Sequence, residues 1–98
     1  MKKLTKAEEQ VMQIIWELGS CMVSEILENL GEPKPPHSTI SSVVRILDKK
    51  GFLSHKAYGR TYVYAPKITK SDYSKFALSK MANSFFGGSV KQLVSFLV

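Results

Sequence analysis

The chain has 98 residues, of which 44% are apolar and 22% charged, and its net charge is +6 at pH 7. This length fits one globular domain, and the apolar runs fall far short of the roughly 20 residues that span a bilayer. Because no signal sequence opens the chain and its single cysteine, Cys21, has no partner for a disulfide, we expect a cytoplasmic protein outside the membrane.

Two helices are predicted in the first third of the chain. Thr5 and Glu8 have the spacing of a capping box, in which two side chains satisfy backbone N–H groups at a helix start. The apolar residues that follow recur with helical period until Gly19: Val11, Ile14, Ile15 and Leu18. Residues 20–22 are a short strand or a connector. A second helix, ended by Gly31, is predicted by the same period in Val23, Ile26, Leu27 and Leu30.

A stiff turn, a third helix and a hairpin come next. Prolines at positions 33, 35 and 36 remove hydrogen-bond donors, so this segment is not helical throughout. Pro36 suits the first turn of a helix that runs to Gly51, with the apolar set Ile40, Val43, Val44 and Leu47. Residues 52–58 and 61–65 are rich in aromatic and β-branched side chains around Gly59-Arg60, which predicts a β-hairpin with a short turn.

Two further helices are predicted after the hairpin. Thr69 and Asp72 have capping-box spacing and open a helix that runs to Gly87-Gly88. Its apolar surface is wider than one stripe, so it can pack against two neighbours, one of them a partner chain. Ser89 caps a last helix with a regular apolar period, formed by Val90, Leu93, Val94 and Leu97.

This order of elements predicts a mainly α fold. Three helices followed by a two-stranded hairpin form the winged variant of the helix-turn-helix. In that fold the third helix enters the major groove of DNA, and the hairpin, or wing, lies on the backbone or minor groove. We therefore predict a winged helix-turn-helix followed by C-terminal helices.

Positive charge gathers around the third predicted helix. Residues 7–33 carry six glutamates and no Lys or Arg, whereas residues 34–61 carry six cations against the single carboxylate of Asp48. A basic segment next to an acidic one can orient a protein on a phosphate backbone. Charge alone is equally consistent with a solvated lysine-rich surface.

The face of the third helix opposite its apolar residues carries small hydroxyls and cations: Ser38, Thr39, Ser41, Ser42, Arg45 and Lys49. Short hydroxyl side chains allow a close approach to base edges, and Arg45 can donate two hydrogen bonds to guanine. A merely solvated face would more often carry Glu, Lys or Gln. Around the hairpin turn lie candidates for phosphate contacts, although hairpin tips are commonly polar without such a role: Lys56, Tyr58, Arg60 and Thr61.

No motif of an enzyme or a metal site is found. His37, His55 and Cys21 are spaced outside the usual patterns of zinc ligands, and the sequence has no phosphate-binding glycine loop, HExxH motif or nucleophile elbow. We therefore expect no catalytic residue, no metal and no cofactor. Trp16 is interpreted as a core or interface aromatic residue.

Several short segments, in their order and spacing, resemble those of the BlaI/MecI family, the penicillinase and methicillin-resistance repressors of bacteria. They are Leu4-Thr5-Lys6-Ala7-Glu8, Ile14-Ile15-Trp16, Ser38-Thr39-Ile40, Val43-Val44-Arg45-Ile46-Leu47, Lys49-Lys50-Gly51, Tyr62-Val63-Tyr64, Gly87-Gly88 and Leu93-Val94. The resemblance implies a winged-helix DNA-binding domain over residues 1–66 and a helical dimerisation region over residues 67–98. It also implies a homodimer that represses a β-lactam-resistance-type operon from a palindromic operator of double-stranded DNA.

The resemblance implies roles for individual residues as well. The residues that fall where DNA contacts are expected in the family are Ser38, Thr39, Ser42, Arg45 and Arg60. The dimer interface is expected on apolar side chains of the last two helices: Phe76, Met81, Phe85, Phe86, Leu93, Val94 and Leu97.

Three departures from the family pattern limit these implications. Family members released by proteolysis are cut at an Asn-Phe bond, and the aligned candidate here, Phe96-Leu97, is a poor match for a regulatory protease. The paired cysteines of the copper-responsive relatives are absent, which disfavours metal sensing. The sequence stops at Val98 inside an apolar helical pattern, so we expect a shortened chain with a weaker dimer.

Two other functions are compatible with a winged helix. A module for protein interaction would carry an apolar or acidic exposed face on the third helix, and a nonspecific DNA-packaging protein would carry more Lys and Arg. The hydroxyls and Arg45 on that face favour a sequence-specific repressor.

Overall fold

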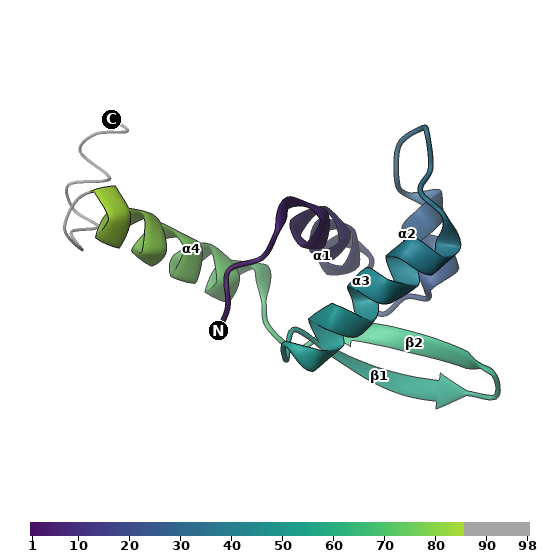
Figure 1. Cartoon of the computed structure of the whole chain (residues 1–98). Helices are drawn as coiled ribbons and strands as arrows, with labels where there is room; N and C mark the ends of the chain where they lie inside the picture. Colours follow the sequence, from purple (N-terminus) through teal and green to yellow (C-terminus); the bar gives the residue numbers. More distant parts are fainter. Residues whose placement is uncertain (86–98) are drawn as a thin grey trace.

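The computed structural model describes residues 1–85, which form four helices and one two-stranded antiparallel sheet (Figure 1). The elements are α1 (Lys6–Leu18), α2 (Val23–Glu28), α3 (His37–Lys49), β1 (Leu53–Tyr58), β2 (Thr61–Pro66) and α4 (Lys70–Phe85). Figure 1 shows α3 lying beside the hairpin, while α4 leads away from the unit of the first three helices. The predicted winged helix-turn-helix is confirmed. The last predicted helix, with Val90 to Leu97, lies outside the described residues.

The start of α1 is fixed by a capping box and an ion pair. The backbone N–H of Glu8 donates to Thr5 Oγ1 at 3.3 Å, and the backbone N–H of Thr5 donates to Glu8 Oε1 at 2.8 Å. Lys50, which follows α3, donates to both carboxylate oxygens of Glu8 at 2.9 and 2.8 Å. Glu8 therefore caps its own helix and joins it to the end of α3, and it is 5% exposed.

Helix α2 is shorter than the apolar period predicted. It ends at Glu28 rather than continuing past Leu30 to Gly31. The Lys34 ammonium donates to the carbonyls of Leu27 and Leu30 at 2.8 and 2.9 Å, so a side chain from the following turn binds oxygens that would accept helical N–H groups. This contact comes from outside the helix, which is why the periodicity of α2 did not reveal it.

The hairpin is attached to the helices at its base. Leu53 pairs with Pro66 and Tyr58 with Thr61, and the two-residue loop begins with Gly59 in the left-handed region, at φ 64°. The backbone of Cys21 exchanges two hydrogen bonds with that of Tyr64, at 2.9 and 2.8 Å. Residues 20–22, expected as a strand or connector, thus form a single bridge to the wing.

The first turns of α4 belong to the core of the winged-helix unit. Thr69 Oγ1 accepts a hydrogen bond from the backbone N–H of Asp72 at 3.0 Å, so it caps the helix as predicted. The ring of Tyr73 lies edge-on to Phe52 at 5.7 Å, and its hydroxyl accepts from the backbone N–H of Leu4 at 2.9 Å. Phe76, expected at a dimer interface, is half-buried against this core.

The buried core joins all three of the first helices to the base of the hairpin. It contains Leu4, Val11, Met12, Ile15, Cys21, Ile26, Ile40, Val44, Leu47, Phe52, Leu53, Tyr64 and Tyr73. Trp16 is half-buried beside this cluster, as expected of a core aromatic, and its indole N–H donates to the carbonyl of Ile68 at 2.8 Å. Within residues 1–85, no helix is long and apolar enough to cross a membrane.

Candidate nucleic-acid interface

Helix α3 divides into a buried and an exposed side as its sequence predicts. Ile40, Val44 and Leu47 are buried, because they lie on one face of the helix and meet the core. The predicted hydroxyl and basic side chains are exposed, except that Ser41 is half-buried: Ser38, Thr39, Ser42, Arg45 and Lys49. The helix thus presents a largely polar, basic strip to solvent, interrupted near its end by Ile46, which is 46% exposed.

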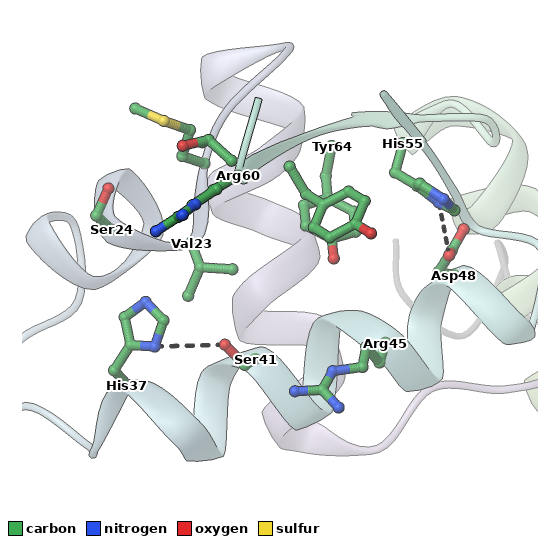
Figure 2. Close-up of a pocket in the computed structure, with 12 residues that line it drawn as sticks. Val23, Ser24, His37, Ser41, Arg45, Asp48, His55, Arg60 and Tyr64 are labelled. Carbon is green, nitrogen blue, oxygen red and sulfur yellow. Dashed lines mark hydrogen bonds and ion pairs between the residues drawn. The ribbon is translucent and has the colours of Figure 1, made fainter. Parts of the chain in front are cut away.

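A groove of about 670 Å³ separates this strip from the wing (Figure 2). Helix α3 contributes His37, Ser41, Arg45 and Asp48, and the wing contributes His55, Arg60, Thr61, Tyr62 and Tyr64. The start of α2 closes one end with Met22, Val23 and Ser24. Two arginines from different elements, Arg45 and Arg60, therefore face one open groove, which is where an anionic backbone would be attracted.

The structure brings together only part of the predicted site. Ser41, Arg45, Arg60 and Thr61 line the groove. Ser38, Ser42 and Lys49 lie on the exposed strip beside it. Lys56 and Tyr58 are exposed but do not line the groove; they alternate with His55 and Ala57 along β1 and occupy the other face of the hairpin. Thr39 lines a separate recess between α1 and α3, together with Ile40 and Val43.

Of the six cations in residues 34–61, two have partners within the fold and four are available to contact DNA. Lys34 donates to carbonyls at the end of α2, and Lys50 is paired with Glu8. Both cations stabilise the fold. The segment's other four, which are all exposed, are Arg45, Lys49, Lys56 and Arg60.

Sequence reasoning missed several side chains of the groove. His55 Nδ1 lies 2.8 Å from Asp48 Oδ2, and His37 Nδ1 is 3.4 Å from the Ser41 hydroxyl (Figure 2). Tyr62, which is exposed, packs edge-on against His55 with ring centroids 5.5 Å apart. The alternation of β1 and β2 placed His55, Tyr62 and Tyr64 on one face, and the four-residue spacing of His37 and Ser41 placed them on one side of α3.

The surroundings of Tyr64 in the groove favour its uncharged form. Burial raises the pKa of Tyr64, and the nearby carboxylate of Asp48 raises it further. The hydroxyl is therefore a neutral hydrogen-bonding group at physiological pH. Among residues 1–85, no group of three or more His, Cys, Asp or Glu side chains is placed to hold a metal ion.

Comparison with known proteins decides what kind of winged helix this is. The family model described as penicillinase repressor matches residues 4–98. This chain belongs to the penicillinase repressor family. The family consists of transcriptional repressors, which are not enzymes, and the expectation of a non-enzymatic repressor is confirmed on that ground.

Known repressors of this family match almost the whole chain. It is 34% identical over 98 residues to the penicillinase repressor of Bacillus licheniformis, a match that covers 96% of this chain and 77% of the relative. It is 27% identical over 93 residues to the methicillin resistance regulatory protein MecI of Staphylococcus aureus strain N315, covering 94% and 76%.

Solved structures of penicillinase repressors show the same fold. The DNA-binding domain of the repressor BlaI superposes with a TM-score of 0.63 at 38% identity, covering 74% of this chain and 94% of that one. Monomeric BlaI of B. licheniformis in complex with the blaP half-operator gives a TM-score of 0.60 at 36% identity, covering 74% and 89%. The resemblance stated from the sequence is thereby confirmed.

Proposed function

We propose that this member of the penicillinase repressor family binds operator DNA with α3 in the major groove and the wing on the backbone. The observation that supports the proposal most is the exposed strip of hydroxyls and cations on α3, next to a groove that two arginines face. A related protein of the same fold is described in complex with half of an operator. A module for protein interaction has less support, because hydroxyls and cations dominate the exposed face of α3 and Ile46 is its single large apolar side chain that is strongly exposed.

The proposed contacts divide by chemistry. Arg45 reads a guanine, since it stands on a rigid helix and can donate two hydrogen bonds to one base edge. The other α3 side chains proposed to contact DNA are Ser38, Thr39, Ser41, Ser42 and Lys49. The wing residues proposed to bind phosphates are Lys56, Tyr58, Arg60 and Thr61.

We further propose that two copies bind a palindromic operator. Residues 1–66 form the DNA-binding domain in this scheme, and residues 67–98 hold the dimer together. Leu78 and Met81 support it, because both are large apolar side chains of α4 that are more than 40% exposed. The other proposed interface positions are the remaining ring surface of Phe76, the side chain of Phe85, which is not described, and Phe86, Leu93, Val94 and Leu97, which lie outside the described residues.

The remaining parts of the proposal concern regulation. The regulated operon is of the β-lactam-resistance type, in line with the names of the relatives. The candidate bond for a regulatory protease is Phe96-Leu97, outside the described residues, and its departure from Asn-Phe argues against release by cleavage there. A repressor meets its operator in the bacterial cytoplasm, so we place the protein there.

The test is binding to fragments of the DNA upstream of the chain's own gene, compared with random DNA, at two salt concentrations. We expect footprinted binding to a sequence with dyad symmetry and a steep fall in affinity as salt rises. Weak binding that ignores sequence would contradict the proposal and favour the protein-interaction module.

A further inference from the structure

Asp48 is an unusual residue for its position. It is the single carboxylate between Glu32 and Asp72, and it stands in the last turn of α3, where the helix dipole disfavours a negative charge. It also lines the groove that the DNA backbone is proposed to follow, where a carboxylate repels phosphates. Because both the helix dipole and the nearby phosphates disfavour its negative charge, the carboxylate is expected to have a basic side chain beside it.

Two basic side chains, Arg45 and His55, are candidates for that partner. Arg45 lies three residues before Asp48 on the same helix, a spacing at which ion pairs form readily. Among residues 1–85, however, the basic side chain that contacts the Asp48 carboxylate is His55 of β1, whose Nδ1 lies 2.8 Å from Oδ2. Figure 2 shows the guanidinium of Arg45 pointing along α3 away from Asp48, whose carboxylate turns to the wing.

The ring of His55 lies against two tyrosines of the wing and is 45% exposed. Its ring packs edge-on to Tyr62 at 5.5 Å and lies 6.0 Å from the ring of Tyr64. Tyr64 is in turn hydrogen-bonded through its backbone to Cys21. These contacts place the imidazole on the side of the wing that the carboxylate of α3 reaches.

We propose that His55 is a positioning residue for base recognition: it engages Asp48 and so leaves the guanidinium of Arg45 available to the DNA. Without His55, the carboxylate turns to Arg45 and competes with the base. The inference rests on the proposed function, because it needs Arg45 to read DNA. It assigns to the one acidic residue of the groove, and to its partner on the wing, a role in specificity.

The test measures a specificity ratio, the affinity for the upstream fragment that the wild-type chain protects divided by that for a scrambled fragment of equal composition. The variants are His55→Phe, which keeps a ring against Tyr62 and Tyr64, Asp48→Ala, and the two combined. His55→Phe is repeated in an Arg45→Ala background. Circular dichroism checks that each variant is folded.

We expect His55→Phe to lower the ratio by about three- to tenfold, and Asp48→Ala in the same chain to restore it to within about twofold of wild type. His55→Phe has no further effect when Arg45 is already Ala.

Three results would overturn the inference. A double variant no better than His55→Phe, or a loss of the same size in Asp48→Ala alone, would mean that the pair holds the wing rather than protecting Arg45. A wild-type chain with no preference for its own upstream DNA would contradict the proposed function, and this inference with it.

Discussion

At the scale of single residues, Arg45 and Arg60 face the same groove from supports of different stiffness. Arg45 stands in the middle of a 13-residue helix packed on the core, whereas Arg60 is the second residue of a two-residue hairpin loop. A stiff support favours the fixed geometry of base recognition, and a loop is sufficient for a charge on a phosphate.

Replacing Arg45 by Ala is expected to cost about 1 to 3 kcal/mol of operator binding and to relax the preference at one base pair. The measurement is affinity for a set of singly substituted operators. Arg60→Ala is the matched control, because it should weaken all sequences alike and reduce the slope of affinity against salt by about one charge. Equal losses on operator and random DNA for Arg45→Ala would contradict its role in reading a base.

The thiol of Cys21 is expected to be unreactive in the folded protein. Burial raises its pKa to about 11, and the carboxylate of Glu25 adds to the effect. Since the thiolate is the reactive form, alkylation by iodoacetamide at pH 8 should be slow in buffer and fast in denaturant, as followed by mass spectrometry. Rapid labelling under native conditions would show that the bridge between Cys21 and Tyr64 opens readily.

At the scale of elements, the buried carboxylate of Glu8 joins α1 to the end of α3 by accepting hydrogen bonds from Thr5 and Lys50. Burial by itself would raise the pKa of Glu8, but hydrogen bonds from Lys50 and from Thr5 outweigh it and lower the pKa below its usual value. The carboxylate thus stabilises the folded state above the usual glutamate range, and this contribution is lost as pH falls through the lowered pKa.

Lys50→Met is expected to lower the free energy of unfolding by about 1 to 3 kcal/mol, because it leaves a buried carboxylate short of a donor. Urea unfolding at pH 7 and pH 4 measures the effect. Glu8→Gln is the companion variant, since glutamine also completes a capping box but cannot ionise. It should lose less stability than wild type between pH 7 and pH 4. An equal loss in both proteins would exclude Glu8 as a source of acid sensitivity.

The elements that sequence reasoning placed well are those with local signals. Thr5 with Glu8 and Thr69 with Asp72 opened α1 and α4 as predicted, and Gly59 marked the hairpin loop. The end of α2 was wrong because Lys34 reaches back to it from the next turn. Contacts between segments of this kind have no periodicity along the chain.

In the candidate site, too, the sequence predicted the local features and not the contacts between segments. The hydroxyls and Arg45 were found because a helix exposes residues at fixed spacing. The pair of Asp48 and His55 was missed, because the distance between them depends on how the hairpin docks on α3. Lys34 and Lys50 were counted with the basic surface, although their partners in the folded chain are carbonyls and a carboxylate.

At the scale of the whole molecule, α4 is the link between the DNA-binding unit and the proposed dimer. Its first half packs on the core through Tyr73 and Phe76, whereas Leu78 and Met81 are 42% and 46% exposed. These two lie three residues apart and share one side of the helix. A second copy that covered this side would double the DNA-binding surface.

Met81→Glu is expected to yield monomers that protect only half of the operator dyad, because a charge in an apolar interface is costly to bury. Sedimentation measures the oligomeric state, and footprinting measures the protected length. Ser79→Glu is the matched control, since it adds the same charge to another exposed side of α4. A Met81→Glu chain that sediments as a dimer would contradict this interface.

The hydrogen bond from Trp16 to Ile68 has a practical consequence. Trp16 is the single tryptophan of the chain, and its indole N–H is bound to the segment that leads from the wing to α4. Its fluorescence therefore comes from one place only, the joint between the part proposed to hold DNA and the part proposed to hold the second copy. The protein carries a native optical probe there, which would report without any label whether occupying an operator bends that joint.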